Sequence, residues 1–128
     1  MNKRTLIAIC SLLAGITVII GAFGAHGLEA FLTKTGRADT FETAVKYQMY
    51  HSIALVLCGI LLSPNNRRLV SVSAILFLCG IVLFSGSLYL LIGTQQTGIG
   101  MVAPVGGLSF VGGWIVLAFA AIRDESMN

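Results

Sequence analysis

Apolar residues fill three long stretches of the chain, and charged residues are confined to the short segments between them. The stretches without Asp, Glu, Lys or Arg are residues 5–28, 47–66 and 69–122. A bilayer core about 30 Å thick is crossed by about 20 helical residues, each rising about 1.5 Å. The first two stretches therefore fit one crossing each. The third fits two, because a polar break from Gly93 to Gly98 divides it.

This pattern predicts an all-α integral membrane protein, folded as a four-helix transmembrane bundle in a single membrane domain covering residues 1–128. The expected helices are residues 5–26, 39–62, 69–92 and 104–122. Gly27 is suited to end the first helix, since glycine commonly follows a helix C-terminus. Pro104 is suited to the first turn of the last helix.

The segment between the first two helices, Leu28–Ala38, is expected to form a surface loop near the lipid headgroups. Asp39 and Glu42 have the spacing of a capping box at the start of the second helix. Glu42 and Lys46 stand four residues apart, in the order that favours an ion pair on a helix surface.

Composition strengthens the membrane prediction. Hydrophobic residues make up 56% of the chain and charged residues 10%, with a mean hydropathy of +0.92. An ordinary soluble domain has about a quarter of its residues charged. The net charge of +3 comes from basic residues near helix ends. No basic run, aromatic platform or zinc spacing indicates nucleic-acid binding.

The N-terminus resembles a signal peptide, since two basic residues precede an apolar run. The apolar run from Thr5 to Ala25 is long enough to span, whereas a signal sequence has about 7–15 apolar residues, so a retained first helix is expected. The three cysteines, Cys10, Cys58 and Cys79, lie in predicted spans without a C-x-x-C pair. They are expected to act as small apolar residues.

Basic residues also predict the orientation of the bundle. With four spans, five lie at the end that carries both termini: Lys3, Arg4, Arg67, Arg68 and Arg123. Three lie at the opposite end: Lys34, Arg37 and Lys46. Positive residues favour the cytoplasmic side of a membrane, so both termini are expected in the cytoplasm.

Small residues indicate where helices pack closely, because lipid gives apolar helices no hydrophobic drive to associate. The candidate packing glycines are Gly21 and Gly24 in the first helix and Gly106, Gly107 and Gly113 in the last. They are expected to pack spans within one chain. The alternatives are a seam between copies in a homo-oligomer and a lipid site.

Polar side chains gather on one face of the second helix. At 100° per residue, Tyr47 and Gln48 fall within 60° of His51, so all three should turn into the bundle. His51 is expected to point towards the first or the third helix, and its expected partners are the hydroxyls of Ser85, Ser87 or Tyr89 in the third. A neutral hydrogen-bonding role for His51 is favoured over a proton, ligand or metal role. His26, at the end of the first helix, is expected to cap it or lie at the interface.

These residues do not assemble a recognisable catalytic or metal site. Neither histidine has a carboxylate or thiolate partner at ligand spacing, and Gly86-Ser87-Leu88-Tyr89 is not a nucleophile elbow. No catalytic residue, metal or cofactor is therefore expected.

Four segments carry a resemblance to a known family: GAFGAHGL at 21–28, TAVKYQMYH at 43–51, FSGSLY at 84–89, and PVGG at 104–107 with Gly113-Trp114. They touch all four predicted helices in order. The chain resembles domain-of-unknown-function family 423, also called uncharacterised protein family 0382, whose members are small four-helix bacterial membrane proteins. It departs from the family pattern at Phe41, where Trp is common, and at Ala103, where Thr often precedes the proline. The resemblance implies the fold and a plasma-membrane location, and brings no activity, substrate or cofactor.

The expected function is that of a non-enzymatic structural or interaction component of the plasma membrane, with the lipid bilayer as its surroundings and a homo-oligomer as one expected assembly. A protein partner has no signature in the sequence, and nucleic acid is not an expected partner. The alternative is a small oligomeric transporter or channel. The glycine-rich helices favour the first, and the polar face of the second helix favours the alternative.

Overall fold

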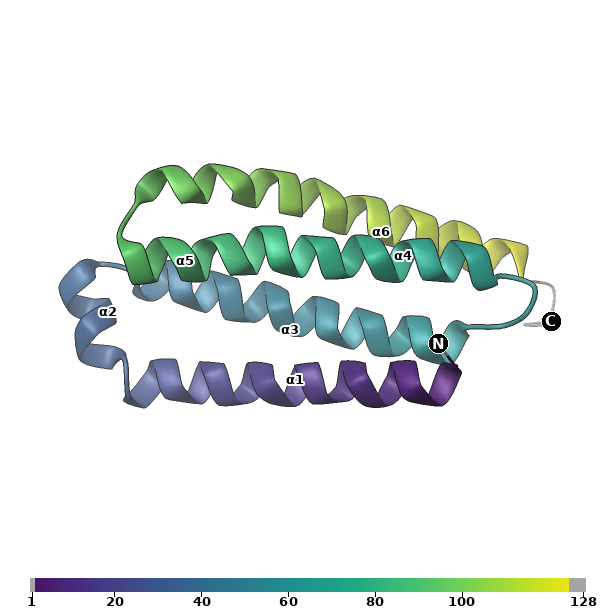
Figure 1. Ribbon diagram of the computed structural model, residues 1–128, viewed down its shortest axis with the longest axis horizontal. Coiled ribbons are helices and arrows are strands. Elements are labelled where there is room, and N and C mark those ends of the chain that lie inside the picture. The colour runs from purple at the N-terminus through teal and green to yellow at the C-terminus, as the bar shows by residue number, and fades with distance from the viewer. Residues whose placement is uncertain (1, 125–128) are drawn as a thin grey trace.

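The computed structural model describes residues 2–124, which are almost entirely helical (Figure 1). In chain order the elements are α1 (Lys3–His26), α2 (Glu29–Thr35), α3 (Ala38–Leu61), α4 (Arg67–Gly80), the π-helix η1 (Ile81–Gly86), α5 (Ser87–Thr94), the 3-10 helix η2 (Thr97–Val102) and α6 (Ala103–Arg123). Within the described residues, four helical stretches are long and apolar enough to cross a membrane: Lys3–His26, Ala38–Leu61, Arg67–Thr94 and Thr97–Arg123. The four-span prediction is confirmed.

The spans lie side by side, and each runs antiparallel to the one before it (Figure 1). α3 packs against α1 on one side and against α4, η1 and α5 on the other, while α6 packs mainly on α4 and η1. The start of α1, the loop at residues 62–66 and the end of α6 meet at one end of the bundle, here called the Arg67 end. α2 and the turn at residues 95–96 lie at the opposite end, here called the α2 end.

The connection between the first two spans contains an element that the sequence pattern did not predict. Residues expected to form a loop include α2, a two-turn helix that ends at Gly36. Gly36 has φ 65°, a left-handed conformation that glycine adopts without a Cβ clash. α1 ends before Gly27 as expected, but Gly27 itself has a right-handed φ of −74°.

The start of α3 also differs from the expected capping box. The N-cap is Arg37, without a side-chain cap bond, and Asp39 lies in the first turn of the helix. A carboxylate there still favours the positive end of the helix dipole. The Glu42–Lys46 ion pair is confirmed, with 2.8 Å between Lys46 Nζ and Glu42 Oε1.

The third span is longer and less regular than expected. It runs from Arg67 to Thr94, and its middle turn, Ile81–Gly86, is a π-helix. A π-helix takes one more residue per hydrogen-bonded turn than an α-helix, so it rotates everything that follows. The span ends at Gln95, whose φ of 57° reverses the chain.

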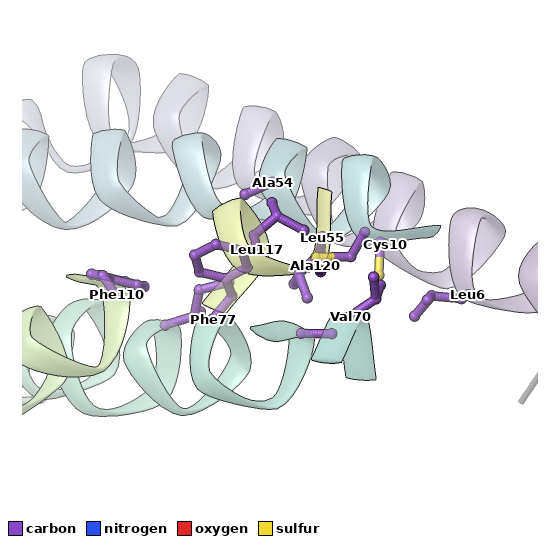
Figure 2. Close-up of a cluster of buried hydrophobic side chains, with 12 residues drawn as sticks. Leu6, Cys10, Ala54, Leu55, Val70, Phe77, Phe110, Leu117 and Ala120 are labelled. Carbon is purple, nitrogen blue, oxygen red and sulfur yellow. The ribbon is translucent and has the colours of Figure 1, made fainter. Parts of the chain in front are cut away.

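The main core fills the bundle from its middle to the Arg67 end (Figure 2). Its buried members are Leu6, Cys10, Ala54, Leu55, Cys58, Val70, Ala74, Phe77, Ile81, Phe110, Leu117 and Ala120. A smaller cluster near the α2 end holds Leu32, Phe41, Leu91 and Ile92. The cysteines are free thiols: Cys10 and Cys58 are buried, and Cys79 is exposed.

Candidate functional site

The centre of the bundle holds His51, which is 5% exposed on α3. Its Nδ1 lies 2.7 Å from the carbonyl oxygen of Tyr47, one turn earlier. Its Nε2 lies 3.2 Å from the indole Nε1 of Trp114 on α6. A carbonyl only accepts and an indole N–H only donates. Therefore the arrangement selects one neutral tautomer, with the proton on Nδ1 and both ring nitrogens occupied.

Aromatic rings surround the imidazole on several sides. The Phe110 ring stacks on it, with centroids 3.4 Å apart and planes 7° apart. Phe77 lies 5.5 Å away and packs edge-on against Trp114. Tyr47 closes a further side at 6.2 Å. His51 is thus held by packing as well as by two hydrogen bonds.

A second polar contact joins α3 to the half of the third span that lies nearer the α2 end. Tyr89 Oη donates to Gln48 Oε1 at 2.8 Å, and Gln48 is buried. Ser85 Oγ donates to the carbonyl oxygen of Ala44 at 2.7 Å. Ser85 belongs to η1, so the rotated turn aims its hydroxyl at α3.

Serine hydroxyls also join α4 to α6. Ser73 Oγ donates to the carbonyl oxygen of Gly113, and Ser109 Oγ donates to that of Leu76, each at 2.8 Å. These contacts give the two hydroxyls hydrogen-bond acceptors, which the hydrocarbon of a bilayer cannot provide. They also bring the two helix backbones together.

The structure therefore divides the predicted polar cluster instead of gathering it. Ser85, Ser87 and Tyr89 were the expected partners of His51, and that prediction is wrong. Ser87 donates to Phe84 in its own span, and the partner of His51 comes from α6. The face of α3 that carries His51 meets Phe110 and Trp114 of α6. His26 lies exposed at the end of α1, apart from these contacts.

The predicted packing glycines differ in what surrounds them. A Cβ added at Gly106 would overlap the backbone of Phe84, and one at Gly113 would lie 2.6 Å from the Phe77 ring. At Gly24 it would overlap the Phe41 ring, and at Gly21 it would lie 3.2 Å from Val45. At Gly107 the nearest atom would be 3.9 Å away, so the close packing expected at Gly107 is absent.

Sequence reasoning missed a polar cluster at the Arg67 end. The Asp124 carboxylate, 4% exposed, accepts hydrogen bonds from Ser63 Oγ at 2.8 Å and from Asn66 Nδ2 at 2.7 Å. Asn66 Nδ2 also donates to the carbonyl oxygen of Leu61, and Asn66 Oδ1 accepts from the backbone N–H of Ser63. We call Ser63, Asn66 and Asp124 the loop clasp. Its signal was the Ser-Pro-Asn-Asn turn, which sequence reasoning used only to stop a helix.

Across residues 2–124, no group of three or more His, Cys, Asp and Glu side chains is placed to hold a metal ion. The hydrogen bonds of His51 with Trp114, of Gln48 with Tyr89 and of Ser73 with Gly113 each join one span to another. Their chemistry is that of holding spans in register.

Comparison with known proteins gives a consistent family. The family described as "Protein of unknown function (DUF423)" matches residues 20–107. The UPF0382 membrane protein SH2409 of Staphylococcus haemolyticus is 40% identical over 116 residues, covering 91% of each chain. UPF0382 membrane protein YwdK of Bacillus subtilis is 38% identical over 109 residues, covering 84% of this chain and 88% of its own.

A relative from a different bacterial group agrees. The UPF0382 inner membrane protein YgdD of Escherichia coli is 34% identical over 127 residues, covering 96% of this chain and 93% of its own. No solved structure matches the chain significantly. With four apolar spans, these similarities place the protein in the bacterial plasma membrane as a multi-pass protein. The chain belongs to the DUF423 family, the UPF0382 membrane proteins.

Proposed function

We propose that this protein is a non-enzymatic structural or interaction component of the bacterial plasma membrane, which acts through its outer surface. The observation that carries the proposal is that the polar side chains at mid-membrane bond to the bundle itself. His51, Gln48 and Ser73 each have a hydrogen-bond partner in another span. A path for a solute needs polar groups that face it instead.

The filled interior supports the same proposal. Phe77 is fully buried, and the stacked rings of His51 and Phe110 occupy the space between α3 and α6. Hollows lie near the two ends of the bundle. One is lined by α1, α2 and the start of α3. Two others lie at the Arg67 end: Leu62 and Arg67 line one, and Arg68 and Arg123 line the other.

The buried serines Ser73 and Ser85 support a non-enzymatic role. An activated serine needs a base within hydrogen-bond reach. Ser73 and Ser85 instead donate to backbone carbonyl oxygens of other spans. Both nitrogens of His51 are occupied by Tyr47 and Trp114.

A flux experiment tests the proposal against the transporter alternative, which the histidine at mid-membrane favours. Purified protein is reconstituted in liposomes, and proton, cation and small-solute flux is measured across a pH gradient. We expect the flux of protein-free liposomes, because His51, Gln48 and Ser73 bond to other spans and not to a path. Protein-dependent flux that depends on pH and disappears in His51→Gln, with the fold retained, overturns the proposal.

A further inference from the structure

Two hollows lie next to each other between α4 and α6 at the Arg67 end. The larger, about 490 Å³, and the smaller, about 280 Å³, share the lining residues Leu69 and Arg123. The α4–α6 groove consists of Asn65, Asn66, Arg68, Leu69, Val116, Phe119 and Arg123. The larger hollow has the polar residues at the end of the bundle, and the smaller one has the apolar residues.

The apolar part of the groove follows the direction of the spans. Val116, Phe119 and Arg123 stand at positions i, i+3 and i+7, which places them on one face of α6. Seven residues of helix cover about 10 Å along the helix axis. An acyl chain in the surrounding leaflet runs along the same direction.

The polar part of the groove carries the positive charge of Arg68 and Arg123. Arg68 and Arg123 are both exposed, and neither has a hydrogen bond or ion pair among residues 2–124. The neighbouring carboxylate of Asp124 is buried and accepts hydrogen bonds from the other two clasp residues. Two guanidinium groups therefore lie at the end of the groove, next to its apolar part.

We propose that the α4–α6 groove binds one anionic phospholipid. Its phosphate lies at Arg68 and Arg123, and one acyl chain lies along Leu69, Val116 and Phe119. A guanidinium donates two parallel hydrogen bonds to a phosphate, and basic residues at a membrane surface attract anionic lipids. The inference deepens the proposed function, on which it rests, by naming a partner for the outer surface.

Other occupants fit these features less well. A free phosphate would leave the apolar part of the groove unused. A second copy docked through this groove about a two-fold axis would bring the same arginines of both copies together. Like charges at an interface oppose association.

Arg67 provides a matched control. It lies next to Arg68 and carries the same charge, but it lines a different hollow, with Lys3 and Pro64. In that hollow Lys3 Nζ already donates to the carbonyl oxygen of Ile60 at 2.5 Å. A specific groove depends on Arg68 far more than on Arg67, whereas diffuse surface charge depends on both equally.

The experiment titrates the purified full-length protein in a non-ionic detergent with phosphatidylglycerol and counts bound lipid by native mass spectrometry. We expect one lipid to bind with highest affinity. Arg68→Gln and Arg123→Gln should each weaken this binding about fivefold, the scale of one basic residue at an anionic membrane surface. Arg67→Gln should change it less than about twofold. Thermal unfolding without added lipid checks that each variant is folded.

A second pair of variants tests whether the acyl chain lies in the apolar part of the α4–α6 groove. Val116→Trp fills the smaller hollow and should weaken binding although both arginines remain. Val111→Trp adds the same side chain at an exposed position of α6 outside the groove, and should leave binding unchanged. Equal effects of the two variants overturn the assignment of the acyl chain to this groove.

Four other results overturn the proposal. Equal affinity for phosphatidylcholine would show that the groove does not recognise an anionic headgroup. An equal loss of lipid affinity in Arg67→Gln would show that diffuse surface charge accounts for binding. Competition by inorganic phosphate at equal concentration would show that the ligand is a free anion and not a lipid. A dimer that forms through Val116 and excludes lipid would show that the groove binds a second copy of the chain. The assay contains no gradient, so solute flux in liposomes would refute the proposed function without changing the lipid result.

Discussion

His51 makes three kinds of contact with a single side chain. Nδ1–H donates within α3, Nε2 accepts from Trp114 of α6, and one ring face lies on Phe110. A neutral imidazole offers one donor and one acceptor, and both are used. A proton added at Nε2 would remove the acceptor that Trp114 needs. The neutral form of His51 therefore belongs to the packing between α3 and α6.

Substitutions at this contact should lower stability in a definite order. His51→Leu leaves the Trp114 N–H without an acceptor and should reduce the free energy of unfolding by about 1–3 kcal/mol. His51→Gln should cost less, because its amide oxygen can still accept. Trp114→Phe should cost about 1 kcal/mol by removing the same bond from the other side. Unfolding in mixed detergent micelles, followed by helix content, measures all three.

The double variant of His51→Leu and Trp114→Phe separates the shared bond from packing. Residues in direct contact couple by about 0.5–3 kcal/mol. Ser87→Ala is the control, because the Ser87 hydroxyl bonds only to a carbonyl oxygen of its own span. Strict additivity of the two substitutions would contradict the bond.

At the scale of elements, α6 approaches the third span through two glycines seven residues apart. Gly106 lies against the backbone of Phe84 in η1, and Gly113 lies against the Phe77 ring. The carbonyl oxygen of Gly113 also accepts the Ser73 hydroxyl. Small side chains at these two positions permit both the backbone approach and the hydrogen bond.

Glycine substitutions on α6 should therefore differ sharply between neighbours. Gly106→Leu and Gly113→Leu should destabilise the bundle by about 1–3 kcal/mol or more, because a Leu side chain separates the helices. Gly107→Leu is the matched control: it makes the same chemical change where the nearest atom to a new Cβ is 3.9 Å away. We expect it to change stability by less than about 0.5 kcal/mol. The yield of folded protein and its unfolding in detergent give the comparison, and equal losses in all three would contradict the packing.

The sequence predicted the elements well where hydropathy alone decides them. The four expected helices correspond to α1, α3, the span Arg67–Thr94 and α6, each within two residues of its expected bounds. α2 was missed, because a seven-residue helix between spans leaves no hydropathy signal. The expected N-cap, Asp39, lies two residues beyond the actual N-cap, Arg37, because α3 already begins at Ala38.

The candidate site was only half predictable for a geometric reason. A helical wheel places Tyr47, Gln48 and His51 correctly on the inner face of α3, but a wheel says nothing about which span lies opposite. The wheel for the third span also fails beyond Ile81, because η1 inserts a wider turn. The Gln48–Tyr89 bond and the His51–Trp114 bond thus depend on packing between spans.

On the scale of the whole molecule, the two ends of the bundle differ in charge and construction. The Arg67 end is closed by the loop clasp, which ties the loop at residues 62–66 to the end of α6. Its basic groups are not ion-paired within the described residues. At the α2 end, Lys46 is paired with Glu42, and Glu29 and Asp39 add negative charge. This asymmetry favours a cytoplasmic Arg67 end.

Cysteine labelling in intact cells tests the orientation. In a background with the three native cysteines replaced, Thr33→Cys on α2 should react with a membrane-impermeant maleimide, and Asn65→Cys should not. Both positions are exposed, and neither interrupts the loop clasp or the left-handed turn at Gly36. Permeabilised cells, in which both positions should react, provide the control. Labelling of Asn65→Cys alone from outside would reverse the orientation.

Trp114 has a consequence for how this protein can be observed. It is the single tryptophan of the chain, it donates to His51, and it is 43% exposed on the side of α6. Indole fluorescence responds to hydrogen bonding and to the polarity around the ring. All of the tryptophan emission of this protein therefore arises where the central contact meets the membrane. The molecule carries its own optical reporter of the junction between α3 and α6.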